Sequence, residues 1–373
     1  MISRLPIALV CLWTLGFVAT GAADPVVADL SGILAQGQEL QIVGSEFGAK
    51  EQGAPLRWDD FDSEQNGAHV LDIDAGGQWD VTPPSSDRTP VYSNAMGRYN
   101  GDMCVLQDYD DASNKRFSLM NGNYDTLYVH FWVFRHDHAG MAMRAQNVTL
   151  WPKFSRNGGN PDAFPQSRID QYWFNGSGHM TFEYYCEDTG TGGWDIDGIN
   201  EPWLGEWFRM QRYIEIEDAG VPNGYTWAAH DTDVFVDRTG MFRGPGCDPD
   251  RNYNGFMIGD YVASQDGATL RQYLSECYVD ITQARIEIGD NADWDSCSHR
   301  EIQVPRSWVG SQIEFEVNDG TFQEGQPAYV FVVNENGVPS RGFPVVFGAT
   351  HTAGDAGPPG KPGTPSGSGS GSR

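Results

Sequence analysis

Apolar and polar residues alternate with a period of two along most of this chain, a pattern that predicts β-strands. In the segment 125–134, DTLYVHFWVF, a Leu-Val-Phe-Val set alternates with a Tyr-His-Trp-Phe set. Further strands are predicted at 179–188, 206–218, 225–237, 277–290, 311–317 and 328–334. Helical spacing of apolar residues is nearly absent, and turn sequences such as PNG separate the strands. The predicted fold class is therefore all-β, in sandwiches whose strands bury alternate faces.

Segment 125–134 has two sets that are both apolar or aromatic, so both of its faces must be covered. One interpretation places the second set along a concave groove. The other makes this segment the central strand of a thick core.

Residues 1–23 have the form of a secretory signal peptide. Arg4 precedes an apolar run from Leu5 to Val18, and small residues follow. This run is shorter than the roughly 20 residues that span a bilayer, and no later stretch is long enough either. We therefore expect an exported protein, secreted or at the cell surface, without membrane insertion.

The net charge is strongly negative, at −27, with 51 acidic and 24 basic residues. Such a surface repels phosphate backbones, which disfavours nucleic-acid binding. It also provides oxygen ligands of the kind that calcium prefers.

Five cysteines follow the signal peptide, and export permits disulfides between them. They are Cys104, Cys186, Cys247, Cys277 and Cys297. An odd number leaves one thiol free or shared with a second chain, so self-association through it is one expectation. No C-x-x-C pair is present, which argues against a zinc ribbon.

Residues 351–373 differ in composition from the rest. Glycine recurs every third residue at Gly354, Gly357, Gly360 and Gly363, and SGSGSGSR follows. This collagen-like tail predicts an extended spacer and a flexible linker. We expect the natural polypeptide to continue past Arg373, and the tail offers a second route to self-association.

Two distant segments carry the halves of one pattern. The first, G-x-x-L-x-I-x-G-x-x-F-G, runs from Gly37 to Gly48. The second lies within 299–348, where Trp308 precedes an S-Q-I strand and V-x-N-x-x-G-x-x-S begins at Val332. Together they resemble the IPT/TIG family of extracellular immunoglobulin-like modules, and the resemblance covers less than a third of the chain.

Insertion of one domain into another is the simplest account of this split. The module would comprise 28–55 and 282–350, with a second domain at 56–281 between them. Sheet contacts between 37–48 and 299–348 are then expected. The alternative is that 28–50 forms the first strand pair of a single large sandwich.

The inserted part resembles the concanavalin A-like jelly rolls, which include lectins, laminin-G-like modules, glucanases and polysaccharide lyases. The stretches that carry this resemblance lie at 57–67, 127–134, 205–237 and 277–290. A shared fold of this kind does not fix one activity.

Folds of this class support two kinds of polysaccharide cleavage. Retaining glucanases of this fold resemble E-x-D-x-E on one strand, because two carboxylates must flank the glycosidic bond that is cleaved. This pattern is missing here, which argues against glucanase activity. Lyases of this fold need a cation to neutralise the uronate and a Tyr or His to move protons. His130, Arg209, Gln211 and Tyr213 are the candidates for this alternative, but the alginate-lyase patterns R-x-E-L, Q-I-H and Y-x-K-x-G-x-Y are missing.

Sugar binding requires rings for stacking and a few donors around them. The candidate ligand-binding residues are His130, Trp132, Tyr172, Trp173, Arg209 and Trp227. The alternative for these aromatic residues is the core. The main functional prediction is a secreted protein that binds extracellular polysaccharide or matrix through a lectin-like jelly roll, displayed on the module and tail. The alternatives are a polysaccharide lyase acting on an acidic polysaccharide and a structural surface or filament protein without ligand.

A structural calcium ion is the one cofactor predicted. DRNYNG at 250–255 resembles the first half of a calcium loop, with Asp250, Asn252, Asn254 and the nearby Asp260 as candidate ligands. A metal-free polar loop is the alternative. A second candidate combines DDFD at 59–62 with Asp280.

Overall fold

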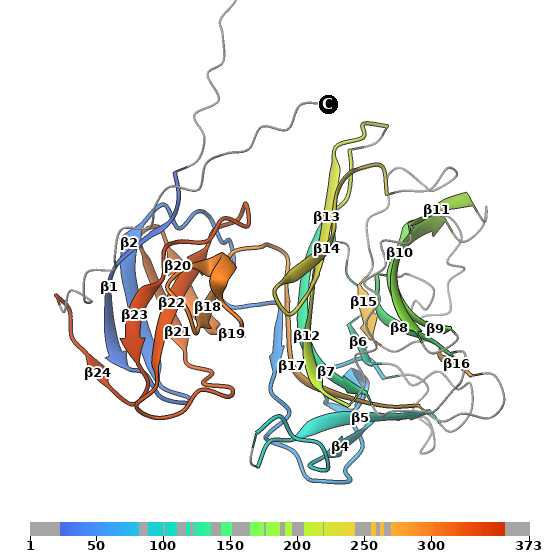
Figure 1. Cartoon of the computed structure of the whole chain (residues 1–373), viewed down its shortest axis with the longest axis horizontal. Helices are drawn as coiled ribbons and strands as arrows, with labels where there is room; N and C mark the ends of the chain where they lie inside the picture. Colours follow the sequence, from blue (N-terminus) through green and yellow to red (C-terminus); the bar gives the residue numbers. More distant parts are fainter. Residues whose placement is uncertain are drawn as a thin grey trace, which may run out of the picture.

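The structure is a computed structural model with two β-rich bodies side by side (Figure 1). It describes residues 23–354 except 82–88, 100, 110–116, 120–121, 123, 136–142, 151–164, 175–176, 187–190, 196–204, 219, 243–254, 259–261 and 265–269. Of these, the backbone alone is described at 109, 117–118, 257, 262–264 and 270 and for the strands within 143–195. Apart from short 3-10 turns at Ile73–Ala75 and Trp294–Ser296, every described element is a strand. The predicted all-β fold is confirmed.

The smaller body is a sandwich of two antiparallel sheets. Its five-stranded sheet has the order β20 (Val304–Val309), β21 (Gln312–Glu316), β2 (Glu39–Ser45), β1 (Val26–Ile33), β24 (Thr350–His351). Its four-stranded sheet has the order β19 (Arg300–Ile302), β18 (Arg285–Gly289), β22 (Pro327–Val333), β23 (Phe343–Val346). Both ends of the chain therefore contribute to this body.

The larger body is a second sandwich. Its eight-stranded sheet has the order β14 (Asp233–Gly240), β13 (Gly224–His230), β12 (Trp207–Glu215), β7 (Thr126–Arg135), β17 (Leu270–Asp280), β5 (Cys104–Tyr109), β4 (Val91–Ser93), with β3 (Arg57–Asp59) paired to β17. Its seven-stranded sheet has the order β11 (Thr191–Asp195), β10 (Ser177–Cys186), β9 (Pro165–Phe174), β8 (Met143–Leu150), β15 (Phe256–Ile258), β6 (Phe117–Leu119), with β16 (Val262–Ser264) paired to β8.

The predicted contact between the two chain ends is present. Leu40 pairs with Phe315 and Ile42 with Ile313 in the β2–β21 ladder, and all four side chains are buried in the core of the smaller body. Position 44 of the initial pattern has no room for a side chain, because a Cβ there would lie 1.9 Å from the Val26 carbonyl oxygen. Glycine is therefore required at this position. Membership of the IPT/TIG family and the domain borders stay predictions.

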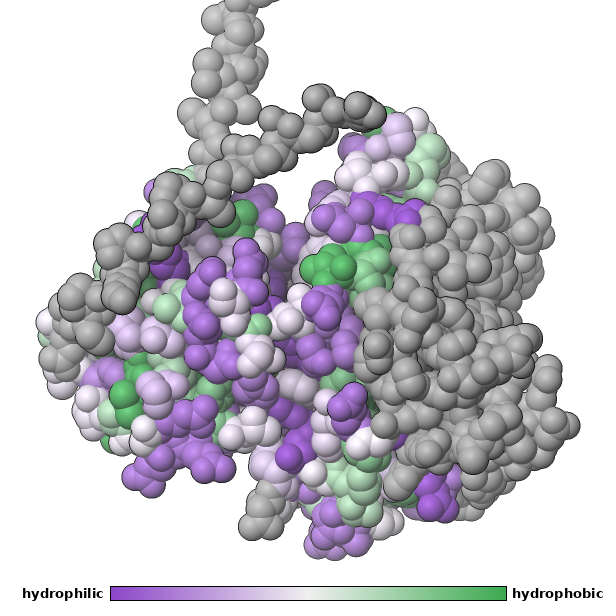
Figure 2. All heavy atoms as spheres, viewed as in Figure 1, coloured by the Kyte–Doolittle hydropathy of each residue, from purple (hydrophilic) through white to green (hydrophobic). Residues whose placement is uncertain are grey.

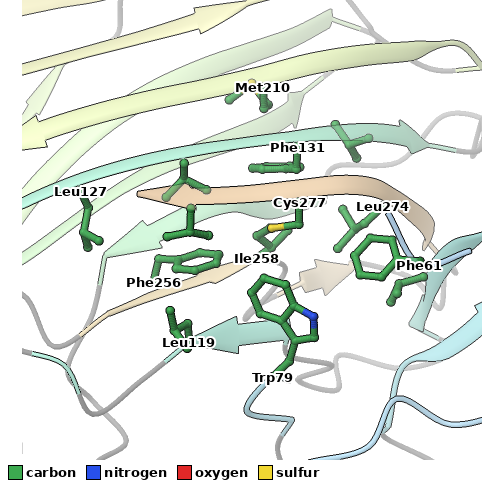
Figure 3. Close-up of a cluster of buried hydrophobic side chains, with 14 of the residues drawn as sticks. Phe61, Trp79, Leu119, Leu127, Phe131, Met210, Phe256, Ile258, Leu274 and Cys277 are labelled. Carbon is green, nitrogen blue, oxygen red and sulfur yellow. The ribbon is translucent and has the colours of Figure 1, made fainter. Parts of the chain in front are cut away.

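The core of the larger body lies between its two sheets (Figure 3). Phe131 of β7, Met210 of β12 and Leu274 of β17 face Phe256 of β15, and all are buried. The first set of segment 125–134 is therefore core, as its alternation predicts. Trp79 packs edge-on against Phe256, with ring centroids 6.2 Å apart.

The described cysteines of known side-chain position, Cys104, Cys277 and Cys297, are buried free thiols. Of the residues that the structure describes, none belong to a helix long and apolar enough to cross a membrane. The described surface of the smaller body is mostly hydrophilic, with apolar residues scattered among polar ones (Figure 2). The proposed signal peptide up to residue 22 and the tail from 355 lie outside the described residues.

Candidate functional site

The predicted lyase candidates meet on one face of the eight-stranded sheet. In the β7–β12 ladder, Arg209 pairs with Trp132, Gln211 with His130, and Tyr213 with Tyr128. Cross-strand partners share a face, so these residues form one cluster. Each of them is at most 6% exposed.

The smaller body covers this face, and a buried ion-pair network joins the two bodies. Glu287 of β18 accepts from Nη1 of Arg209 at 2.9 Å, Nε of Arg285 at 2.6 Å and Nε of Arg300 at 3.0 Å. Burial alone would raise the pKa of Glu287, but the three guanidinium groups hold it well below its usual value. Arg209 therefore serves as a contact between the bodies.

The other polar groups of the cluster are engaged internally. Gln211 Oε1 accepts from the Tyr128 hydroxyl at 2.9 Å, and Gln211 Nε2 donates to the Asp231 carbonyl at 3.2 Å. Tyr128, His130 and Trp132 of the second set thus lie in a contact between the bodies, and not along an open groove. Phe134, the last member of the set, packs against Cys104 and Tyr273 of the larger body. Alternation shows that both faces are buried, but it does not show what covers them.

His130 lies at the centre of this contact and is fully buried. Burial, aided by the Arg209 charge, lowers the pKa of His130 well below its usual value, so the ring is neutral. Neither ring nitrogen has a hydrogen-bond partner among the described residues. The ring packs edge-on against Trp132, with centroids 6.4 Å apart.

Trp227, on β13, is half-buried at the edge of the same contact. Its Nε1 donates to Gln283 Oε1 at 2.5 Å, and its ring lines a cavity of about 370 Å³ between the bodies. Trp132 and Arg209 line a smaller adjacent cavity of about 200 Å³.

The remaining predicted ligand residues, Tyr172 and Trp173, lie on the other sheet. Tyr172 of β9 pairs with Arg144 of β8 on one side and with His179 of β10 on the other. Arginine, tyrosine and histidine thus occupy adjacent register positions across three strands. Trp173 occupies the neighbouring position and belongs to the opposite face.

Register also shows which face holds this row. The core residue Phe256 pairs with Leu150, and Leu150 pairs with Ser167 of β9. Odd positions of β9 therefore belong to the core face, and even positions, including Tyr172, to the outer face. The six predicted ligand residues are consequently divided between two sheets.

Two further polar rows follow on the outer face. Asp170 pairs with Gln146 and Thr181, and Arg168 pairs with Thr149 and Glu183. Arg144, Gln146 and His179 are not among the site residues predicted from the sequence. The signal was present as the alternation of His179, Thr181 and Glu183 with Met180, Phe182 and Tyr184, but only the register connects it with β8 and β9.

The calcium candidates Asp250, Asn252, Asn254 and Asp260 lie outside the described residues, so calcium there stays a prediction. Asp280, from the second calcium candidate, instead forms a buried ion pair with Lys50. In the part of the chain that the structure describes, no three His, Cys, Asp or Glu residues are grouped as metal ligands.

Comparison with protein families and with curated proteins gives no match. Among solved structures, alginate lyase Aly36B matches with a TM-score of 0.42 and 9% identity over 61% of this chain and 97% of that one. The marine PL-14 alginate lyase from Aplysia kurodai matches with a TM-score of 0.42 and 9% identity, over 60% of this chain and 98% of that one. The endo-beta-1,4-glucuronan lyase from the fungus Trichoderma reesei matches with a TM-score of 0.39 and 11% identity, over 61% of this chain and 95% of that one.

Proposed function

We propose that this protein cleaves an acidic polysaccharide by β-elimination at the outer face of the seven-stranded sheet. The observation that carries the proposal is the row of Arg144, Tyr172 and His179 at adjacent register positions. This reaction needs three kinds of group: a cation, a proton acceptor and a proton donor. The row supplies one of each.

Each member of the row has a role in the proposed reaction. Arg144 neutralises the uronate carboxylate, which makes the C5 proton more acidic. His179 accepts that proton, and the C5–H electrons form the C4=C5 double bond while the C4–O4 bond breaks. Tyr172 gives its proton to O4 of the leaving sugar. The products are a reducing end and an unsaturated end, and no co-reactant is consumed.

The adjacent rows support a polymer substrate. The positions of Gln146, Asp170 and Thr181 come next on the same face, followed by those of Thr149, Arg168 and Glu183. Amide, hydroxyl and charged groups are the types that bind sugar hydroxyls and carboxylates. Because residues 1–23 predict export, we expect the substrate to be extracellular.

The test is incubation of the full chain with alginate, glucuronan and polygalacturonate, with a neutral glucan as control. Formation of unsaturated ends is followed by their ultraviolet absorbance. Activity on at least one uronate polymer supports the proposal, and its absence on a broad panel of such polymers contradicts it.

A second candidate function is binding of a glycan or matrix polymer without cleavage. The observation that favours it is the aromatic and cationic cavity beside Trp227. A glycan array separates this function from the lyase, because a pure binder retains uronate polymers without releasing unsaturated products.

A further inference from the structure

A cavity of about 370 Å³ opens between the two bodies, and the surface is notched between them (Figure 2). Its lining includes Trp227 and Gln211 from the larger body and Arg285, Trp294 and Arg300 from the smaller one. Neither body forms this site alone. The volume lies at the lower end of the range for small-molecule sites and suits one sugar ring.

The charges behind this cavity do not balance. Arg209, Arg285 and Arg300 all pair with the single carboxylate of Glu287, and all four residues are buried. Two positive charges are left over in a chain that is otherwise strongly acidic. Buried charge without a partner is costly, so this cluster favours an additional anion.

Unused donors occur on the cavity lining. Arg285 uses Nε for Glu287 and Nη1 for the Gln283 carbonyl at 2.9 Å. Arg300 likewise uses Nε for Glu287 and Nη1 for the Trp294 carbonyl at 2.9 Å. Among the described residues, the Nη2 groups of both arginines donate to no oxygen acceptor, although the Arg300 side chain also interacts with the Cys297 thiol.

The Gln283 amide adds a third donor group. Its Oε1 accepts from Trp227, while its Nε2 has no partner in the described part of the chain. The two carboxylates of the lining, Asp237 and Asp295, are exposed and therefore hydrated. The buried part of the cavity wall thus offers donors to an incoming anion.

Two indole rings flank these donors. The Arg300 guanidinium carbon lies 3.9 Å from the Trp294 ring centroid, and that of Arg285 lies 5.8 Å from Trp294 and 5.9 Å from Trp227. Indole faces stack against the apolar face of a pyranose. Cations held beside such rings place an anionic substituent close to a stacked sugar.

We propose that this cavity binds an anionic sugar residue, with Arg285, Arg300 and Gln283 donating to its carboxylate or sulfate group and the indoles contacting its ring. The sugar part of this inference rests on the proposed function, whereas the anion part does not. The site is separate from the Arg144–Tyr172–His179 row, which lies on the other sheet.

Isothermal titration calorimetry at low ionic strength tests the proposal with glucuronate, glucose 6-sulfate, glucose and inorganic sulfate as probes. We expect saturable binding of glucuronate or glucose 6-sulfate that weakens with added salt, and no binding of glucose. The two charged sugars distinguish a carboxylate from a sulfate ligand. Equal affinity for inorganic sulfate and glucose 6-sulfate overturns the sugar part, and no binding of any anion overturns the whole proposal.

The matched variant is Gln283→Glu, which retains an acceptor for Trp227 Nε1 and replaces the free donor with a negative charge. We expect anion binding to weaken by about tenfold or more, while the melting temperature is maintained because the new carboxylate pairs with Arg285. Unchanged anion affinity in this variant contradicts the site. Tyr172→Phe is the control on the other sheet: it keeps cavity binding, so failure of the lyase proposal and failure of this one are distinguishable.

Discussion

Lys50 and Asp280 form a buried ion pair at the place where the chain leaves the smaller body and returns to it. The two side chains are only 1% and 2% exposed, and the residues are 230 positions apart. Lys50 also donates to the Ala284 carbonyl at 3.3 Å, and the Tyr278 hydroxyl donates to Asp280 Oδ2 at 2.9 Å. A charge pair therefore fastens the two connections between the bodies.

Lys50→Met should destabilise the protein by about 3–5 kcal/mol, because it leaves the buried Asp280 carboxylate without its cation. Asp280→Asn should also destabilise it, since Lys50 then loses its anion. The double variant should cost less than the sum of the two, as measured by urea denaturation. Additive losses would show that the pair does not act as a unit.

The Glu287 network predicts an asymmetry between its members. Glu287→Gln leaves three buried guanidinium groups without a carboxylate and should cost about 3–5 kcal/mol or more. Arg209→Met leaves Glu287 with Arg285 and Arg300, so its cost should be clearly smaller. Denaturation of both variants checks this order, and equal losses would argue that charge balance does not govern the contact.

Asp59 should make stability depend on pH. Burial raises the pKa of Asp59 to about 6. The hydrogen bonds that its carboxylate accepts from Trp79 Nε1 at 2.7 Å and from the Phe61 amide at 2.9 Å lower the pKa, but by less than burial raises it. Because the folded-state pKa lies above the unfolded one, its stabilising contribution is complete below about pH 4 and is lost as pH rises through about 6. The change is on the order of 2–3 kcal/mol.

Asp59→Asn removes this titration. The unfolding free energy of the wild type should therefore fall relative to that of the variant, by on the order of 2–3 kcal/mol, as pH rises from about 4 to 7. Urea denaturation across this range measures it, and parallel curves would contradict the assignment.

Tyr172→Phe and His179→Ala should each lower lyase activity by about 10²–10⁴-fold, because each removes a proton-transfer group. Trp173→Phe is the matched control, since position 173 belongs to the core face of the same strand. Activity is measured on the polymer that wild type cleaves best. Full activity in Tyr172→Phe would exclude that tyrosine as the proton donor.

Gly44→Ala should destabilise the smaller body by roughly 3 kcal/mol or more, because the new Cβ would lie 1.9 Å from the Val26 carbonyl oxygen and 2.5 Å from the Phe47 ring. Gly37→Ala is the control: it also belongs to the initial pattern, but nothing lies within 4 Å of a Cβ there. Its cost should be about 1–2 kcal/mol, from the positive φ of 70° alone. Calorimetry of both variants tests the difference.

Local pattern predicts the strands of this protein well, and the split glycine-rich pattern predicts sheet contacts between 37–48 and 299–348, which the structure shows as the β2–β21 ladder. The strands follow from alternation among neighbouring residues, and the sheet contact follows from the fixed spacing of glycine and apolar residues within each half of the pattern. The cover over His130 and Arg209 could not be predicted in this way. ARIEIGD at 284–290 reads as an ordinary alternating strand, and only the tertiary structure shows Glu287 among three arginines.

The row of Arg144, Tyr172 and His179 could not be predicted from the sequence for a related reason. Arg144, Tyr172 and His179 lie on three different strands, and their adjacency depends on two ladders and on a β-bulge between Gln146 and Val148. Alternation within a strand gives a face, but not the neighbour across the ladder.

Gln41 and Glu314 face each other in the β2–β21 ladder although 273 residues separate them. During synthesis at about 5–20 residues per second, β2 waits roughly a quarter of a minute to a minute for its partner. The larger body, whose strands are complete earlier, can fold in that interval and bring the two flanking segments together. The smaller sandwich would then assemble only after the larger body has folded. Slower folding of the larger body would leave β1 and β2 unpaired for longer and so expose them to mispairing.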